Sequence, residues 1–131
     1  MILTLFALAA VSDCDAAARL SGLDYRQCLC KVEKRADAEM VSQWRLTLAG
    51  LRKEDAENRR EKANKPILVA GLLDSQRAWL KYRDAECNMV SSQAAGGTGY
   101  GELGAECSIT LTRHRTEILR RRVDGLVRYL R

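Results

Sequence analysis

The chain has 131 residues, of which 47% are hydrophobic, 30% are charged and only one is proline. This length suits one domain with a modest core and excludes a multidomain architecture, and the scarcity of proline favours helices. The net charge of +5 is unevenly placed, because residues 113–131 hold seven arginines against Glu117 and Asp124. The whole excess of positive charge therefore belongs to the C-terminal segment.

An apolar leader is predicted at the start of the chain. Residues 2–11 are uncharged but too few to span a bilayer, which takes about 20 residues. Small residues at 10–12 then fit a signal-peptidase site ahead of Asp13. We therefore expect residues 1–12 to be a signal peptide, truncated at its N-terminus because it lacks a basic n-region, and residues 13–131 to be one helical domain. A buried N-terminal helix is the alternative.

The first long helix is predicted over residues 25–64, because apolar side chains recur there every three or four residues. The inward-facing residues are Leu29, Val32, Ala36, Met40, Trp44, Leu48 and Leu51. Residues 52–65 are almost purely charged and polar, so this end should project into solvent or fray. Pro66 ends the helix, because proline lacks a backbone donor and restricts the residue before it.

Two further helices are predicted, at residues 67–92 and from residue 106 to the end of the chain. Core positions are expected for Trp79 and Tyr82 and, in the first helix, for Trp44. The inner face of the last helix is expected to consist of Leu111, Ile118, Val123, Leu126 and Leu130. No alternating pattern indicates a strand, so the predicted fold class is all-α, a three-helix hairpin-type bundle.

Two cysteines flank the glycine-rich stretch between the second and third predicted helices. Residues 94–104 contain five glycines and lack the Gly-Lys-Ser/Thr signature of a nucleotide-binding loop. Cys87 precedes this stretch and Cys107 follows it. A Cys87–Cys107 disulfide would clamp the loop at its base and contribute about 3 kcal/mol to stability.

Three short motifs together point to a known family. The run from Gln76 to Cys87 reads Q-R-A-W-L-x-x-R-D-A-x-C, and Gly96-Gly97-Thr98 follows it. A C-x-x-x-L-T-x-x-R-x-x-x-L pattern comes next, in Cys107, Leu111, Thr112, Arg115 and Leu119. The first half adds Asp13-Cys14, Gln27-Cys28 and Ala36-Asp37 leading to Met40. In these motifs the chain resembles the LprI-type lysozyme-inhibitor family of small bacterial envelope proteins.

The resemblance implies a second disulfide and a set of structural residues. In the family pattern Cys14 pairs with Cys28, which would tether the N-terminal segment to the first helix and contribute about 3 kcal/mol. The motif residues that would orient the second helix against its neighbours are Gln76, Arg77, Trp79, Arg83 and Asp84.

Cys30 departs from the family pattern. Two positions from Cys28 on a helix, it lies on roughly the opposite face, so a Cys28–Cys30 bridge would distort the backbone. It could compete for Cys14, link two copies of the protein, or be an unpaired thiol buried as a small apolar side chain, and we favour the last. A zinc site would need four converging ligands, and the chain offers only Cys28, Cys30 and the distant His114.

The cysteine count also bears on localisation. Five cysteines in so small a chain are typical of an oxidising compartment. Asp13 directly before Cys14 argues against a lipoprotein, because the lipidation signal needs a small residue there. Together with the leader and the family resemblance, this predicts a periplasmic or secreted protein, for which nucleic acid is an improbable partner.

Enzymatic chemistry, metals and cofactors find little support. His114 is the single histidine, and no serine or cysteine has an obvious base at a recognisable spacing. Asp74, Asp84 and Glu86 invite comparison with glycosidases, which use a carboxylate pair. On a charged helix, a solvated surface paired with neighbouring arginine and lysine is the stronger interpretation.

Two segments are candidates for binding a partner. The glycine-rich loop could enter a partner's cleft through Gly96, Gly97, Thr98, Tyr100 and Glu102, or could be a plain connector. The last helix could engage anionic lipid headgroups or an acidic protein, or could be a solvated face. Its arginines are Arg113, Arg115, Arg120, Arg121, Arg122 and Arg128.

The leading hypothesis is an inhibitor that occludes the cleft of a lysozyme-like muramidase without chemistry. The positive charge of residues 113–131 would repel a basic muramidase unless that helix faces away. A lysozyme-like toxin with an acidic surface would suit the charge better and would make this an immunity-type protein. The alternative is an envelope-binding or scaffolding module that acts through Arg120, Arg121 and Arg122 and has no inhibitory activity.

Overall fold

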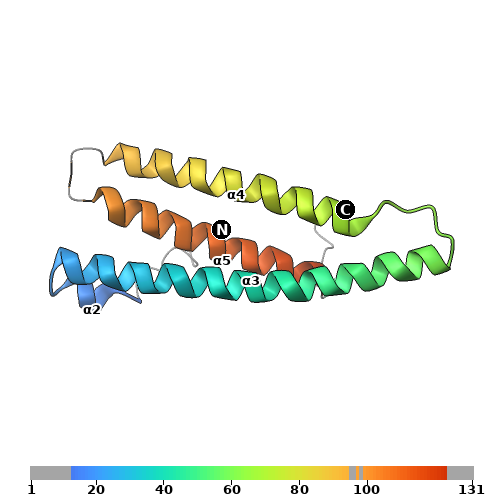
Figure 1. Ribbon diagram of the computed structural model, residues 1–131. Helices are drawn as coiled ribbons and strands as arrows, with labels where there is room; N and C mark the ends of the chain where they lie inside the picture. The colour runs from blue at the N-terminus through green and yellow to red at the C-terminus, as the bar shows by residue number, and fades with distance from the viewer. Residues whose placement is uncertain (1–12, 95–96, 98, 124–131) are drawn as a thin grey trace.

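The computed structural model describes residues 13–94, 97 and 99–123, and within them every regular element is a helix. The four helices are α2 Asp15–Ala18, α3 Gly22–Arg60, α4 Leu68–Gln93 and α5 Tyr100–Val123. The long α3 runs the length of the molecule, and α4 and α5 form a hairpin along it (Figure 1). The predicted all-α class is confirmed for these residues, with a short helix, α2, that was not expected. The predicted signal peptide at residues 1–12 lies outside them.

Helix α3 begins and ends earlier than predicted. Ser21 caps its N-terminus, since its Oγ accepts a hydrogen bond of 3.0 Å from the Asp24 backbone N–H. The helix ends at Arg60, and Lys62 follows with a left-handed φ of 52°. A residue in that conformation cannot continue a right-handed helix. The chain therefore turns before Pro66, the residue that the sequence indicated as the breaker.

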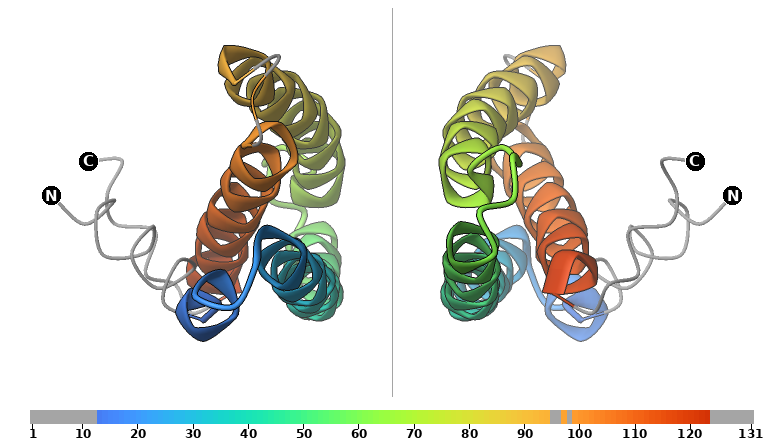
Figure 2. Two further views of the ribbon diagram at one scale, coloured as in Figure 1. Left: turned by 90° about the vertical axis from the view of Figure 1, so that its left-hand side faces the viewer. Right: turned by 90° about the vertical axis from the view of Figure 1, so that its right-hand side faces the viewer.

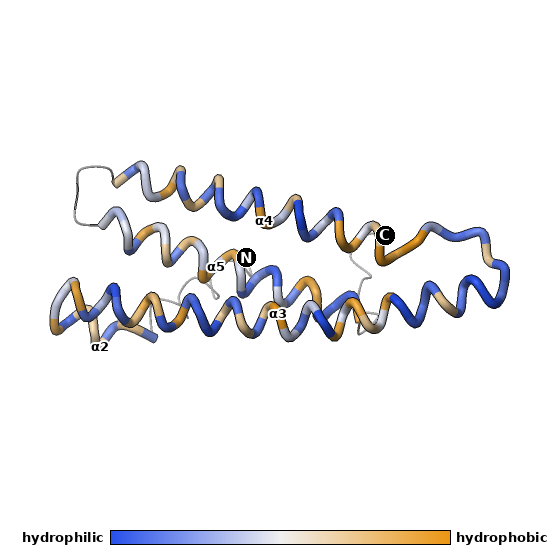
Figure 3. The backbone as a smooth tube through the Cα atoms, viewed as in Figure 1, coloured by the Kyte–Doolittle hydropathy of each residue, from blue (hydrophilic) through white to orange (hydrophobic). Residues whose placement is uncertain are grey.

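The polar end of α3 is anchored by one carboxylate. Figure 3 shows the hydrophilic run there, yet Asp55 is only 5% exposed. Its Oδ1 and Oδ2 accept hydrogen bonds of 2.9 and 3.0 Å from the backbone N–H groups of Leu68 and Val69, at the start of α4. These bonds hold the pKa of Asp55 below its ordinary value. The expectation that residues 52–65 project into solvent or fray is wrong at this position.

Apolar side chains form two clusters along α3. One contains Cys14, Leu29, Val32 and Ile109, and the other contains Met40, Leu72 and Leu119. Trp44 and Trp79 pack against the second cluster, as expected, but Tyr82 is 54% exposed. The inward face of α4 passes through Trp79 and Arg83, and this leaves Tyr82 on the outer side.

The inner face of α5 is more polar than predicted. Its buried residues are Ile109, Thr112, Arg115, Thr116 and Leu119. Leu111 and Ile118 are half-buried, Val123 is 44% exposed, and the predicted Leu126 and Leu130 lie outside the described residues. Buried threonines are tolerated because their hydroxyls bond to backbone: Thr116 donates to the Thr112 carbonyl, and Thr47 of α3 donates to the Leu119 carbonyl at 2.8 Å.

Both predicted disulfides are present, at the same end of the molecule. Cys14 is bonded to Cys28, which fastens the segment around α2 to α3. Cys87 is bonded to Cys107, which fastens α4 to α5 near their connection. The start of α3 and the start of α5 both lie at this end (Figure 1). We call it the disulfide end, defined by residues 13–30 and 84–112.

The three long helices diverge toward the disulfide end. In the end-on views of Figure 2, the C-terminal end of α4 is far from α3, and α5 lies between them. Toward the other end α4 approaches α3, where Gln76 and Leu72 contact the side of α3 that carries Met40. The divergence leaves part of α5 without a helical neighbour on one side.

Candidate functional site

The connection between α4 and α5 is shorter than the predicted loop of residues 94–104. Helix α5 begins at Tyr100, so Tyr100, Glu102 and Gly104 are helical. Of the predicted loop contacts, Gly97 is exposed, whereas Gly96 and Thr98 lie outside the described residues. Tyr100 is 52% exposed, in the first turn of α5. A loop over the whole stretch is therefore not what the structure shows.

Close approach of two helices explains one glycine of this segment. A Cβ atom on Gly104 would lie 2.2 Å from Ser91 Oγ, and Ser91 is buried on α4. The Cys87–Cys107 disulfide joins the same two helices beside this contact. Gly104 thus permits close packing of α4 on α5, where the sequence analysis placed it in a loop.

Contacts between α3 and α5 fix the start of α5. Glu102 has a side chain only 13% exposed, and its Oε1 lies 3.3 Å from Arg26 Nε of α3. Tyr25 of α3 donates a hydrogen bond to Glu106 Oε1. Burial, followed by this bond to a carboxylate, raises the pKa of Tyr25 to about 12. These polar contacts hold the first two turns of α5 on α3.

Charge is segregated along the molecule. Residues 84–112 contain four acidic residues and no lysine or arginine. The last turn of α5 carries Arg120, Arg121 and Arg122, at the opposite end of that helix from Tyr100. Figure 1 shows that end far from the α4–α5 connection. With residues 13–30 included, the disulfide end holds seven acidic residues against Arg19 and Arg26 and is thus acidic, and Arg120, Arg121 and Arg122 lie away from it.

The disulfide end also exposes large apolar side chains. Leu20 and Leu23 are 78% and 60% exposed beside the start of α3, and Leu103 is 38% exposed on α5 near Tyr100. An apolar group surrounded by polar and charged residues is the usual composition of a protein-binding surface.

A groove runs along α5 on the side where α3 and α4 diverge. It consists of a cavity of about 200 Å³ and one of about 340 Å³, and Glu33 of α3 lines both. The small residues Gly101, Gly104, Ala105 and Ser108 of α5 line it as well. Because these side chains are short, the space between the diverging helices stays open. We call it the α5 groove.

Cys30 lies in this groove as an exposed free thiol, so the expectation of a buried thiol is wrong. The neighbouring residues Cys28 and Leu29 face the core, and Cys30 falls on the other side of α3. The Cys28 sulfur is bonded to Cys14, which removes it as a zinc ligand. Among the described residues, no three histidine, cysteine, aspartate or glutamate side chains are arranged so that they could hold a metal ion.

The family-motif residues form a polar network between the helices. Arg83 donates to Asp37 of α3 at 2.9 Å and to Thr112 of α5 at 3.2 Å. Arg115 donates to Gln76 Oε1 at 2.9 Å. Both guanidinium groups lie over the Trp79 ring, at 5.2 and 5.8 Å from its centroid. Arg83 and Arg115 thereby link α4 to both other long helices.

Two other motif residues lie on the surface of α4. Arg77 is paired with Asp74 at 3.9 Å, and Asp84 is paired with Arg83 at 3.4 Å. The side chains of Asp74 and Asp84 are 81% and 69% exposed. These contacts fit the solvated, ion-paired interpretation of the carboxylates rather than a catalytic pair.

The arginines of α5 differ in their surroundings. Arg115 is only 5% exposed, so its assignment to a basic surface is wrong. Arg113 pairs with Asp13 at 2.8 Å. Arg121 and Arg120 both pair with Glu117 and hold its pKa below the ordinary value, with Arg121 the stronger influence. Arg122 is half-buried, and Arg128 lies outside the described residues.

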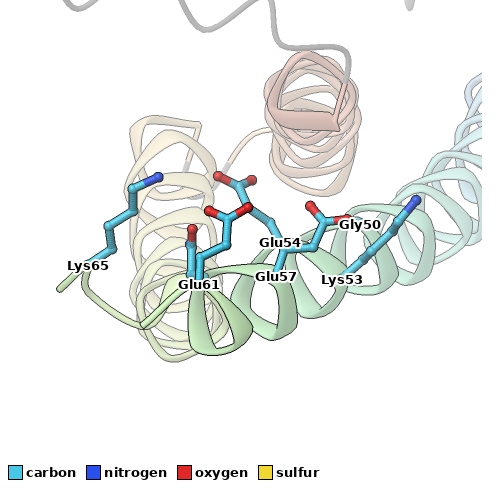
Figure 4. Close-up of a pocket in the computed structure, with 7 residues that line it drawn as sticks. Gly50, Lys53, Glu54, Glu57, Glu61 and Lys65 are labelled. Atoms are coloured by element: carbon cyan, nitrogen blue, oxygen red, sulfur yellow. The ribbon is translucent and has the colours of Figure 1, made fainter. Parts of the chain in front are cut away.

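A separate cavity of about 440 Å³ lies beside the C-terminal part of α3. Figure 4 shows Glu54, Glu57 and Glu61 rising from the same side of the helix, with Lys65 opposite them. Gly50, Lys53 and Asn58 complete its lining. Its walls are polar and carry both signs of charge, so nothing in it distinguishes a ligand.

The chain matches known proteins over most of its length. The family model described as "Lysozyme inhibitor LprI" matches residues 14–119. An uncharacterized protein of Rhizobium meliloti is 32% identical over 113 residues, which covers 86% of this chain and 80% of the relative. No solved structure matches the chain. In the part of the chain that the structure describes, no helix is long and apolar enough to cross a membrane.

Proposed function

Because this chain belongs to the LprI lysozyme-inhibitor family, we propose that it is an exported protein that binds a lysozyme-like muramidase and blocks it. Inhibition occurs by occlusion of the substrate cleft, without chemistry on either partner. Residues 1–12 direct export as a signal peptide, and the mature domain begins at Asp13. The two disulfides support this location, because such bonds persist in oxidising compartments such as the periplasm.

The segregation of charge carries the proposal of a docking surface. A net charge of +5 would oppose binding to a basic muramidase, but the disulfide end holds seven acidic residues against two arginines. An inhibitor that presents its disulfide end meets such an enzyme with complementary charge, which speeds encounter and fixes orientation. The acidic surface therefore favours a basic muramidase over an acidic lysozyme-like toxin.

Exposed apolar side chains provide the contact that charge alone does not. Tyr100 and Leu103 on α5, with Leu20 and Leu23 beside α3, are the anchors on this surface. Aromatic and aliphatic anchors surrounded by polar groups supply most of the affinity in protein interfaces. The disulfides hold the surface in one arrangement, which lowers the entropy lost on binding.

An inhibition assay tests the proposal directly. Oxidised protein is titrated into basic and acidic muramidases acting on peptidoglycan, and the rate of turnover is measured. Dose-dependent inhibition of a basic animal lysozyme, weakened by salt and by Tyr100→Ala, supports it. A variant with Arg120, Arg121 and Arg122 changed to Gln serves as the control, because those residues face away from the docking surface.

The assay also separates the envelope-binding alternative. If no muramidase is inhibited, and if anionic vesicles bind the protein but not the triple glutamine variant, the alternative replaces the proposal. Arg120 and Arg121 are already paired with Glu117, which leaves less free positive charge there than the sequence indicates.

A further inference from the structure

A carboxylate oxygen in the α5 groove lacks a hydrogen-bond donor. Glu102 Oε1 is paired with Arg26, but Glu102 Oε2 is buried and has no partner among the described residues. Leaving a buried charged acceptor without a donor is costly, so this oxygen favours any donor that can reach it. Glu102 lines the smaller cavity of the groove, together with Arg26 and Cys30.

The groove contains a second carboxylate, Glu33, and in the part of the chain that the structure describes this one is not paired with a cation. Glu33 lies where the two cavities meet, and none of the ion pairs among the described residues includes it. Asp84 lines the larger cavity. The two arginines of the groove are already engaged, because Arg26 pairs with Glu102 and Arg83 pairs with Asp37 and Asp84. Among the described residues that line the groove, carboxylate acceptors are therefore in excess and no arginine is unpaired.

The shape of the groove suits a long, narrow side chain. Apart from Glu102, its α5 side is made of glycine, alanine and serine, and its smaller cavity has a volume of about 200 Å³. An arginine or lysine side chain can lay its methylene stem along such a surface and place its cationic head beside the carboxylates. A guanidinium group also carries several N–H donors in one plane. It can therefore donate to two carboxylates at once, which a group with a single N–H cannot do.

From these observations we infer that the α5 groove is the site where a cationic side chain of the muramidase binds, between Glu102 and Glu33. This inference rests on the proposed function and makes it more specific, since it selects muramidases with an exposed arginine or lysine near the substrate cleft. Tyr100 and Leu103 then contact apolar surface beside that residue, at the same end of the molecule.

Substitution of single charges tests the site. Affinity for a basic animal lysozyme is measured calorimetrically for Glu33→Gln, Glu102→Gln and Glu39→Gln. Glu39 is exposed on α3 and lines neither cavity, so its variant makes the same change of charge outside the groove. We expect each groove variant to weaken binding by about tenfold, which is the range for loss of a close charge pair at an interface, and the control to change it by less than about twofold.

Glu33→Gln is the more decisive variant. Glu102→Gln also removes the ion pair to Arg26, so its thermal unfolding must be checked, whereas Glu33 has no ion pair among the described residues to lose. A loss of affinity in Glu33→Gln with unchanged unfolding temperature therefore reports the groove alone. Equal affinities of Glu33→Gln and Glu39→Gln would overturn the inference.

Cys30 gives an independent readout of occupancy. It is the single free thiol among the five cysteines, and it lines the same cavity as Glu102. Bound lysozyme should slow alkylation of Cys30 by a maleimide at least about tenfold, because a filled groove excludes the reagent. Inhibition with unprotected Cys30 would overturn the groove assignment and leave the proposed function standing. Absence of binding to every muramidase tested would overturn both.

Discussion

The two ends of the molecule are held together by different means. At the disulfide end, Cys14–Cys28 ties the segment around α2 to α3 and Cys87–Cys107 ties α4 to α5, and the surface is acidic with exposed apolar side chains. At the opposite end, α3 extends past α5, and Asp55 secures the start of α4 by two hydrogen bonds to backbone. The difference indicates that covalent rigidity is concentrated where a partner is proposed to bind. The other end needs only to connect two helices.

The largest expected effect comes from removing the bond between α4 and α5. Changing Cys87 and Cys107 together to Ser should lower the free energy of unfolding by about 3 kcal/mol, because the unfolded chain regains the entropy of an open loop. Urea unfolding measures this loss. Cys30→Ser is the control, since that thiol is free, and it should leave stability unchanged. If the double serine variant loses less free energy of unfolding than Asp55→Ala does, the opposite end contributes more to stability than the disulfide end, contrary to this prediction.

A smaller effect is expected where α4 and α5 touch. Gly104→Ala should destabilise the protein by about 1–3 kcal/mol, because the new methyl group collides with Ser91 Oγ. Gly101→Ala is the matched control, since its Cβ would meet nothing within 4 Å, and it should be neutral or stabilising. Adding Ser91→Ala should restore much of the free energy of unfolding that Gly104→Ala loses, because it removes the colliding oxygen. It should not increase the free energy of unfolding of the Gly101→Ala variant. Chemical denaturation of the single and double variants decides this.

At the opposite end, Asp55→Ala should make stability less sensitive to acid. The pKa of Asp55 is lowered in the folded protein, so its contribution is present above the ordinary value of 3.8 and is lost as pH falls through the folded value. Thermal unfolding followed from neutral to acidic pH should therefore show a steeper decline for the wild type than for the variant. Parallel declines would mean that the two backbone bonds contribute nothing to stability.

The weakest expected effect is on stability at alkaline pH and comes from Tyr25, at the disulfide end. The pKa of Tyr25 is raised to about 12, so its contribution is complete below the ordinary value of 10.0 and is lost as pH rises from there toward about 12. In a Cys30→Ser background, which avoids thiol exchange, Tyr25→Phe should remove part of the decline in unfolding free energy over that range. An unchanged decline in the Phe variant would show that the bond to Glu106 does not matter.

Sequence reasoning succeeded where the signal was periodic. The apolar spacing from Leu29 to Leu51 identified the inward face of α3, and the cysteines flanking the glycines identified the clamp between α4 and α5. It failed at the start of α5, because a run of glycines ordinarily interrupts a helix. Packing against α4 and the contacts of Glu102 and Glu106 with α3 stabilise helix there in spite of that tendency.

Polar residues were the second source of error. Arg115 was grouped with its surface neighbours in the arginine-rich segment, and Asp55 with a solvated charge run. The residues next to them in the sequence do not distinguish them from exposed charged residues, because each is buried by a partner in another helix. Arg115 bonds to Gln76, and Asp55 bonds to the backbone of Leu68. For Arg115 a signal did exist, because the family motif includes it together with Gln76.

The sequence by itself determined the helical class, the break near Pro66, the disulfide pairing once the family was considered, and the charge of each segment. Those properties depend on composition and on spacing within a few turns of chain. Only the tertiary structure decided that the acidic segment and the arginines lie at opposite ends, that Cys30 is exposed, and that Glu33, Asp84 and Glu102 line one groove. Those properties depend on the angles at which helices diverge, and packing between distant segments sets such angles.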